Sequence, residues 1–380
     1  MKLLFVSHLD PFKPQGGDAQ RLALFLRACC KFADKVDLIA LCDNVKSDID
    51  NCEVIFSANI AEKKINKHKQ LWGVNPQSLF PQNDNVADIV NLYIERGSYD
   101  FIAVKYIPNL FKYGLMDYAD RLIVDVDDHP ADEFRVYAKQ STTFASRVRK
   151  NFLAIKARIL VPSILSQVKY SFFANPNQVI RNGHCAYLPN IPYNVRECNP
   201  IDFKTSGENL LFVGDLNYSP NYLGVAHFIK DIFPKIKQSV PNCTFMIAGN
   251  LKNEATRRAW SEVEGVQILG FVDNLHKIYE LCRVVVAPIY HGGGSNIKVI
   301  EALSMNRACV TTPYSISAFR MQLTNDDLCV ASDDKRFAEC VTRLLRDEEY
   351  NRALATHGCQ SVKKYFSIDA FNETVKKALQ

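Results

Sequence analysis

Glycine is scarce in this chain, at 16 of 380 residues, and no segment repeats or has low complexity. Collagen-like chains and repeat arrays need such features, so both classes are excluded. Hydrophobic residues make up 47% and charged residues 23%, which is typical of a folded globular protein. The length is two or three times that of a common domain, so we expect two domains.

Long apolar runs are also absent. No stretch approaches the roughly 18 apolar residues that a membrane-spanning helix needs. The apolar run at the N-terminus covers only residues 3–6 and is soon followed by Asp10, which makes a poor signal peptide and a good buried strand. We therefore expect a cytoplasmic protein, with peripheral contact to the inner face of a membrane as a further option.

Charge and cysteine patterns exclude two more classes. The 46 basic and 41 acidic residues leave a net charge of +5, too small to predict a nucleic-acid partner. The twelve cysteines form no C-x-x-C pair and no zinc-finger spacing, so we expect small buried side chains in a reducing compartment. The first strand is followed only by Gly16-Gly17 and not by G-x-G-x-x-G, which weighs against a dinucleotide oxidoreductase.

Short apolar segments alternate with amphipathic ones along the whole chain. The strands predicted from this pattern are 2–8, 36–42, 53–58, 100–105, 121–126, 158–162, 209–213, 244–248, 266–269, 284–289, 308–312 and 328–331. The predicted helices include 18–32, 84–96, 163–173, 221–238, 252–262, 273–281, 295–304, 334–347 and 367–379. Continuous apolar strands such as 284–289 indicate burial on both faces, as in parallel sheets covered by helices.

This alternation predicts an α/β protein of two Rossmann-like, doubly wound domains that face each other across a cleft. Prolines and a polar run near 190–208 interrupt both periods and indicate the boundary. We place an N-terminal domain at 1–195 and a second domain at 205–365. A C-terminal helix within 366–380 would cross back to the first domain.

The segment that follows the strand 284–289 is the most informative. Three consecutive glycines stand there: Gly292, Gly293 and Gly294. Glycines before a helix let backbone N–H groups approach an anion closely. Lys298 adds a positive charge suited to a phosphate, and Glu301 shares its helix face, where a carboxylate can accept both hydroxyls of a ribose. The alternative is a flexible loop and a surface Lys–Glu pair.

A second polar segment, 124–130, ends a strand of the first domain. Its acidic residues could bind a metal, accept a proton or cap the next helix, and Asp128 before Pro130 suits capping. His8 ends the first strand, where it either faces the cleft or is structural.

These segments resemble the family-4 retaining glycosyltransferases, which have the two-domain GT-B architecture. The resemblance covers about residues 205–365 and is carried by the glycine-rich turn, the Lys298-x-x-Glu301-Ala-Leu helix and the strand 209–213 followed by Gly214-Asp215. Most of that family has two Glu residues separated by seven others. Here Glu301 is the second, but Gly293 stands at the first position, so the chain resembles a branch that lacks the first Glu.

The resemblance implies a transferase that uses a nucleotide-diphosphate sugar, most simply UDP- or GDP-linked, without a metal or other cofactor. Glu301 would bind the ribose, and Lys298 with the loop backbone would hold the diphosphate. The donor-site residues it implies are Gly17, Gly214, Asp215, His291, Gly292, Gly293, Gly294, Ser295, Asn296, Lys298 and Glu301. His129 would face the sugar, and together with Asp128 and Lys298 it forms the candidate catalytic set.

A basic amphipathic segment in the first domain has two interpretations. Phe144, Val148, Phe152 and Ile155 recur at helical spacing among five basic residues. We expect this apolar stripe to be buried in the core beneath a solvated basic face. The alternative is a helix that lies on an anionic membrane surface and meets a lipid-linked acceptor there.

We therefore predict a glycosyltransferase that retains anomeric configuration and builds a surface polysaccharide or lipopolysaccharide, with a glycan or lipid-linked acceptor. In retaining transfer the leaving phosphate can take the acceptor's proton, so no protein nucleophile is required. One alternative is an inverting GT-B enzyme with Asp128 or His129 as base. Another is a catalytically degenerate scaffold, because the first Glu is missing.

Overall fold

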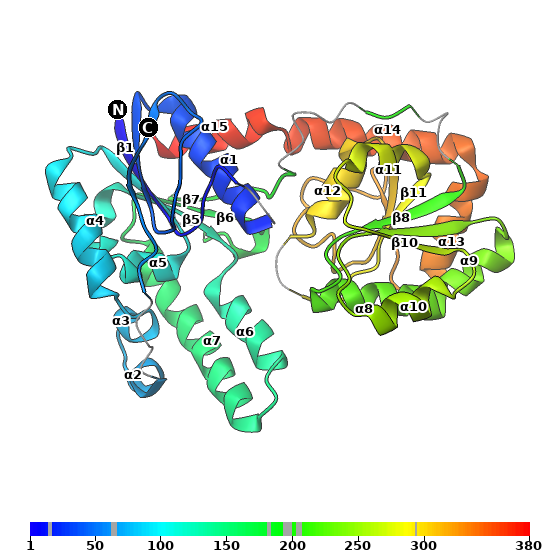
Figure 1. The fold of residues 1–380 in the computed structure, drawn as a ribbon, viewed down its shortest axis with the longest axis horizontal. Coiled ribbons are helices and arrows are strands. Elements are labelled where there is room, and N and C mark those ends of the chain that lie inside the picture. Colours follow the sequence, from blue (N-terminus) through cyan, green and yellow to red (C-terminus); the bar gives the residue numbers. More distant parts are fainter. Residues whose placement is uncertain (14–16, 62–66, 181–183, 193–199, 203–206, 293–294) are drawn as a thin grey trace. The chain divides into compact units, whose positions relative to one another are not determined.

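The computed structural model describes residues 1–13, 17–61, 67–180, 184–192, 200–202, 207–292 and 295–380. The chain divides into two compact units, Met1–Pro189 with Phe371–Gln380, and Asn190–Ala370. Each unit contains one sheet flanked by helices, and every recorded strand pair is parallel (Figure 1). The prediction of two Rossmann-like α/β domains is therefore confirmed.

The first unit is built on a seven-stranded sheet of order β3-β2-β1-β4-β5-β6-β7. Its strands are β1 (Lys2–Ser7), β2 (Lys35–Ala40), β3 (Cys52–Ser57), β4 (Phe101–Lys105), β5 (Leu122–Asp127), β6 (Tyr170–Phe173) and β7 (Cys185–Tyr187). Its helices are α1 (Gly17–Phe32), α2 (Lys67–Trp72), α3 (Pro76–Leu79), α4 (Asp84–Arg96), α5 (Ile107–Lys112), η1 (Leu115–Arg121), α6 (Pro130–Lys139), α7 (Phe144–Leu165) and η2 (Pro176–Gln178). Most of α15 (Ile368–Ala378) also belongs to this unit.

The second unit is built on a six-stranded sheet of order β10-β9-β8-β11-β12-β13. Its strands are β8 (Asn209–Val213), β9 (Thr244–Ala248), β10 (Val266–Gly270), β11 (Val284–Ala287), β12 (Ala308–Thr311) and β13 (Cys329–Val330). Its helices are α8 (Ser219–His227), the π-helix η5 (Phe228–Ile232), α9 (Phe233–Ser239), α10 (Glu254–Ser261), α11 (Leu275–Leu281), α12 (Ile297–Ser304), α13 (Asp334–Arg346) and α14 (Glu348–Tyr365).

Local chemistry explains these elements. All four residues of β11 are buried, as expected for a strand with helices on both faces. Polar side chains cap several helices: the Thr143 hydroxyl accepts from the backbone of Ser146 at the start of α7, and Asp333 caps α13 in the same way. The eleven cysteines in the described ranges form no disulfide, and nine of them are buried. No helix in those ranges is long and apolar enough to cross a membrane.

Two predicted elements are wrong. Residues 158–162 were expected as a strand but belong to α7, and the predicted helix 163–173 includes the strand β6. The run of Ile159, Leu160 and Val161 resembles a buried strand. It continues a helical pattern, however, because Leu153, Ala157, Val161 and Ile164 are buried along one face of α7. Tertiary packing against α6 decided between the two periods.

The position of the apolar stripe on α7 also differs from our expectation. Phe144, Val148, Phe152 and Ile155 are exposed rather than buried. Helix α7 has a second apolar face besides this stripe. The residues of that second face pack into the core of the first unit. Since that face packs inward, the stripe is left at the surface.

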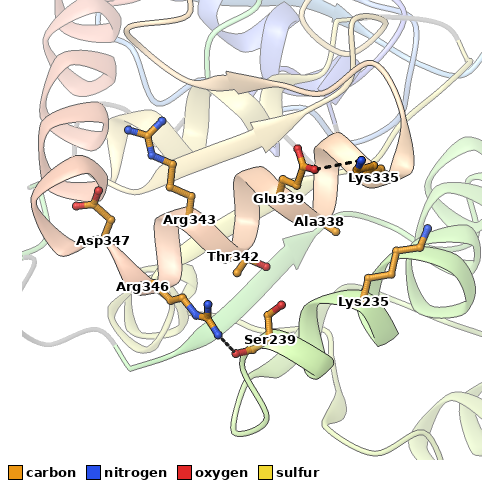
Figure 2. A pocket seen from close by; sticks show the side chains of 9 residues that line it. All are labelled: Lys235, Ser239, Lys335, Ala338, Glu339, Thr342, Arg343, Arg346 and Asp347. Atoms are coloured by element: carbon orange, nitrogen blue, oxygen red, sulfur yellow. Dashed lines mark hydrogen bonds and ion pairs between the residues drawn. The ribbon is translucent and has the colours of Figure 1, made fainter.

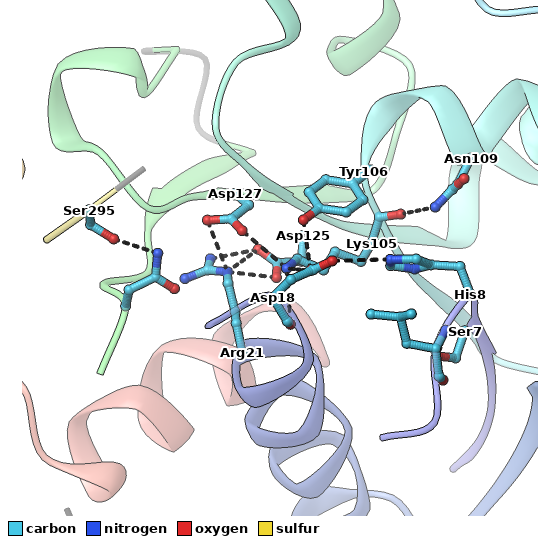
Figure 3. Close-up of polar contacts among 12 residues, drawn as sticks. Ser7, His8, Asp18, Arg21, Lys105, Tyr106, Asn109, Asp125, Asp127 and Ser295 are labelled. Atoms are coloured by element: carbon cyan, nitrogen blue, oxygen red, sulfur yellow. Dashed lines mark hydrogen bonds and ion pairs between the residues drawn. The ribbon is translucent and has the colours of Figure 1, made fainter. Parts of the chain in front are cut away.

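The core of the first unit contains a buried ion pair between α1 and β5 (Figure 3). The Arg21 guanidinium donates to both carboxylate oxygens of Asp125, from Nε at 2.8 Å and from Nη2 at 2.6 Å. It also donates to the backbone carbonyl of Leu188 at 3.0 Å. The side chains of Arg21 and Asp125 are 2% and 0% exposed. Such a pair ties α1 to the sheet, because either charge alone would be costly to bury.

We predict that Arg21→Ala lowers the free energy of unfolding of the first unit by about 3–5 kcal/mol, because it leaves the Asp125 carboxylate buried without its partner. Urea denaturation measures this loss. Arg27→Ala is the matched control on the same helix, since its ion pair with Asp48 at 2.8 Å is partly exposed and should contribute no more than about 1 kcal/mol. Equal losses in the two variants would contradict the importance of the buried pair.

Candidate active site

The order in which the chain adds strands to the second sheet reverses at the centre of that sheet. From β8 the chain runs to β9 and β10 on one side, then returns to β11 beside β8 and continues to β12 and β13. The loops that leave the carboxyl ends of β8 and β11 therefore diverge to opposite sides. In doubly wound folds ligands bind at this switch point. Gly214 and Asp215 follow β8, and the glycine-rich segment follows β11, so both predicted motifs lie at this edge.

Lys298 of α12 packs directly against Gly214. A Cβ atom on Gly214 would lie 3.3 Å from Lys298 Cε and 3.0 Å from Asn221 Nδ2, so the absence of a side chain there makes room for both. The ammonium group lies 5.8 Å from the centre of the Phe212 ring and donates to Asn296 Oδ1 at 3.4 Å. Residues from two distant segments of the sequence thus form one half-buried cationic site.

Glu301 lies one turn further along α12, close to Tyr279 of α11. Burial raises the pKa of Glu301 to about 7, against the opposing effects of Lys298 and Tyr279. Burial also lowers the pKa of Lys298 to about 8, with the Glu301 carboxylate acting in the opposite direction. Both groups are therefore poised near neutral pH, as is common where charged groups await a ligand.

The loop after β11 packs on the loop after β8. Tyr314 donates from its hydroxyl to the Gly292 carbonyl at 2.6 Å, and a Cβ on Gly292 would lie 3.0 Å from Pro220 Cγ. Ser295 accepts from Asn190 Nδ2 at 2.5 Å, and His291 is exposed. Gly293 and Gly294 lie outside the described residues. The start of α12 is thus held by contacts on both sides of the glycine segment.

Asp215 makes local contacts. Its Oδ1 accepts from the backbone N–H of Asn217 at 2.9 Å and from Asn217 Nδ2 at 2.7 Å, while its carbonyl accepts from Asn221 at 2.8 Å. These bonds shape the loop after β8. Because a carboxylate repels phosphate, Asp215 suits a role in shaping this loop better than direct contact with an anion.

Sequence reasoning missed two residues of this site. Tyr279 is fully buried within α11 and resembled an ordinary core aromatic. Tyr314 follows β12, so its place at the carboxyl edge of the sheet was a usable signal.

The first unit has a similar switch point, between β1 and β4, and a polar cluster lies there (Figure 3). Asp18, in the first turn of α1, accepts from Lys105 and from the Tyr106 hydroxyl at 2.7 Å, and lies 3.4 Å from His8 Nε2. Burial alone would raise the pKa of Asp18, but these hydrogen bonds hold it well below its usual range. His8 is thus a partner of Asp18. Gly17, directly before Asp18, is exposed at the start of α1.

Lys105 is fully buried and connects this cluster to β5, because its Nζ also lies 3.0 Å from Asp127. Asp127 ends β5 with a φ of 62°, a conformation that residues other than glycine seldom adopt. Sequence reasoning missed Asp18, Lys105 and Tyr106. The one signal was a lysine at the end of an otherwise apolar strand.

His129, not Asp128, caps α6. Its Nδ1 accepts from the Ala131 backbone N–H at 3.0 Å, and its ring stacks on Phe173 at 6.3 Å. Capping by Asp128, one of the three roles considered for this loop, is therefore wrong. Burial lowers the pKa of His129 to about 4. Since Nδ1 accepts, the proton of the neutral ring sits on Nε2, which can donate to a ligand but cannot act as a base.

Asp128 is the remaining candidate base on this loop. Burial and the neighbouring Asp127 carboxylate raise the pKa of Asp128 to about 7, while Arg21 opposes the shift. It is half-buried. A carboxylate with this pKa can exchange a proton at neutral pH.

A pocket of about 500 Å³ lies elsewhere in the second unit, between α9 and α13 (Figure 2). Its charged lining includes Lys235, Lys335, Glu339 and Arg343, with Lys335 and Glu339 4.0 Å apart. It shares no lining residue with the predicted donor site. In the described part of the chain, no three His, Cys, Asp or Glu side chains gather in a way that could hold a metal ion.

The opposed pKa shifts predict a pH optimum for binding a nucleoside diphosphate. Glu301 ionises as the pH rises through about 7, and Lys298 loses its proton as the pH rises through about 8. Affinity for UDP or GDP, measured by calorimetry, should therefore be highest between these values and fall on both sides.

Two conservative variants distinguish the loss of affinity at low pH from the loss at high pH. Lys298→Arg should abolish the alkaline fall, because arginine stays protonated. Glu301→Gln should abolish the part of the affinity loss at low pH that comes from protonation of Glu301. The part that comes from protonation of the ligand's own phosphate should remain. A profile that is flat from about pH 6 to 9 would contradict the shifted pKa values.

The chain is similar to several known proteins. Residues 207–347 match the family model described as glycosyl transferases group 1. A protein of Klebsiella pneumoniae, described as an uncharacterized 44.6 kDa protein in a cps region, is 23% identical over 177 residues. That match covers 44% of this chain and 45% of the relative, so the chain matches less than half of the relative's length.

Solved structures match over the whole chain. Sucrose-phosphate synthase from Thermosynechococcus elongatus has a TM-score of 0.71 at 14% identity and covers 100% of this chain and 98% of its own. Anabaena HepE in complex with UDP-glucose has a TM-score of 0.62 at 12% identity, with coverage of 100% and 99%. The chain therefore has the GT-B fold, and the match to the glycosyl transferase model covers residues 207–347 of its second unit.

Proposed function

We propose that this protein transfers a sugar from a nucleotide-diphosphate sugar to a glycan or lipid-linked acceptor, with retention, in the assembly of a surface polysaccharide or lipopolysaccharide. One observation carries the proposal: Lys298, one turn before Glu301 on α12, meets Gly214 at the switch point of the second sheet. The structural neighbour HepE, crystallised with UDP-glucose, supports UDP as the nucleotide.

The chemistry of the site suits a nucleoside diphosphate. Lys298 supplies a positive charge beside a loop without a side chain at Gly214, so a diphosphate can approach both the ammonium group and the backbone. Glu301 is a carboxylate that can accept two ribose hydroxyls. In this proposal Lys298 and backbone N–H groups carry the phosphate charge, and no metal is required.

Transfer then needs little from the protein beyond charge stabilisation. The bond from the anomeric carbon to the diphosphate oxygen breaks, and a bond to the acceptor oxygen forms on the same face. The acceptor's proton moves to a leaving phosphate oxygen. Negative charge grows on the departing diphosphate, and Lys298 is placed to stabilise it.

Two alternatives have specific support. The pKa of about 7 at Asp128 favours an inverting enzyme in which that carboxylate is the base. The glycine at position 293, where the family has its first Glu, favours a scaffold that has lost catalysis. Each alternative gives a different outcome in the experiments below.

We predict that UDP or GDP raises the melting temperature of the protein in a panel with ADP, CMP, dTDP and NAD, with and without Mg²⁺. Lys298→Ala and Glu301→Ala should each weaken this binding about ten- to hundredfold, because each removes charge-assisted hydrogen bonds to the ligand. The effect should not depend on Mg²⁺.

The matched controls are Lys277→Ala and Glu262→Ala, which remove the same charges from exposed positions of the second unit. They should bind as the unmodified protein does. Normal affinity in the Lys298 and Glu301 variants would reject this site, and no response to any nucleotide would favour a scaffold.

The stereochemical prediction is tested with UDP-glucose and water as the acceptor. UDP-glucose carries its sugar in the α configuration, so a retaining enzyme should release α-glucose first, as followed by proton NMR. Asp128→Asn should then keep most of the rate. Initial β-glucose, with a loss of about 10²–10⁴-fold in Asp128→Asn, would instead establish the inverting alternative.

A further inference from the structure

Helix α7 carries an exposed apolar stripe. Phe144, Val148, Phe152, Ile155 and Ile159 recur every three or four residues, and each side chain is between 45% and 80% exposed. Residues at this spacing share one face of a helix. Single exposed apolar residues are common in folded proteins, whereas a continuous stripe of large ones indicates a binding surface.

The stripe lies on an ordered element. Helices α6 and α7 pack side by side as a hairpin that extends away from the sheet of the first unit (Figure 1). Lys150 donates to the Tyr137 carbonyl at 3.1 Å, and Arg158 pairs with Asp132 at 2.9 Å, so both ends of the hairpin are tied. On the other side, Lys156 and Arg149 donate to Gln70 at 2.8 and 3.1 Å. The apolar stripe lies between these two sets of contacts.

Charge is concentrated on the same hairpin. Residues 130–165 include seven basic and two acidic residues, a net charge of +5 that equals the net charge of the whole chain. Both acidic residues lie at the start of α6, and none occurs from 134 to 165. Arg147 and Arg158 flank one side of the stripe and Arg149 and Lys156 the other, by helical spacing.

We propose that the α6–α7 hairpin docks on an anionic phospholipid surface, with the apolar stripe among the acyl chains near the headgroups. An apolar stripe bordered by long basic side chains is the pattern of a helix that lies in a membrane interface. Basic side chains can keep their charges among anionic headgroups while their stems cover apolar surface. A second copy of the chain is a poorer occupant, because two hairpins of equal positive charge repel each other.

This inference is independent of the nucleotide site, because it depends only on the described surface of the first unit. The test is co-sedimentation of the full chain with vesicles, either phosphatidylcholine alone or a mixture with phosphatidylglycerol. We expect binding to the mixed vesicles that is at least about tenfold stronger than to phosphatidylcholine and that weakens as salt rises.

Variants separate the apolar and charged contributions. The double variant Phe144→Ser and Ile159→Ser should lose vesicle binding about tenfold or more, and Arg147→Glu should remove most of the preference for phosphatidylglycerol. Leu92→Ser is the matched control, since Leu92 is an exposed apolar residue of α4 in the same unit. It should bind vesicles normally.

Two results would overturn the proposal. One is equal or absent binding to both kinds of vesicle. The other is a dimer in analytical ultracentrifugation that the Phe144→Ser and Ile159→Ser variant dissociates, which would assign the stripe to a second copy. The UDP-induced rise in melting temperature, measured on every variant, reports separately on folding and on the proposed function.

Discussion

Parallel pairing of the strands in both sheets is the constraint on which the rest of the structure depends. When all strands run the same way, their carboxyl ends meet at one edge, and the loops that leave that edge can bring distant segments together. The strand order then sets the place where neighbouring loops diverge. Gly214 and Lys298 are more than eighty positions apart in the chain, yet they touch because β8 and β11 are neighbours.

Both units share this parallel arrangement, but their buried charged groups differ in how fully they are paired. In the first unit, Arg21 and Asp125 are sealed from water, fully matched by hydrogen bonds, and hold α1 on the sheet. In the second unit, Lys298 and Glu301 are half-buried, and the pKa of each is moved toward neutral pH because burial is not fully compensated. The first arrangement favours a rigid structure and the second leaves charge available for a ligand.

The α6–α7 hairpin shows how a helix with two apolar faces is divided between core and surface. Residues such as Leu153, Ala157 and Val161 pack inward. The side chains of the stripe stay outside. Their exposure is a cost in water that a membrane surface would remove, which links the packing of this helix to the proposed docking.

Much of the architecture followed from the sequence alone. The alternation of apolar strands with amphipathic helices determined the fold class, because burial on both faces of a parallel strand requires continuous apolar runs such as 284–287. The glycine segment before Lys298 and Glu301 indicated an anion site for a local reason, since backbone N–H groups at a helix start need no distant partner.

Only the tertiary structure decided which side chains these segments meet. No local pattern reveals that Lys298 lies against Gly214, that Lys105 joins Asp18 to Asp127, or that His129 rather than Asp128 caps α6. It also decided that residues 158–162 are helical and that the α7 stripe is exposed, because two apolar faces competed for one core. Periodicity specifies the faces of an element, whereas packing selects the face that is buried.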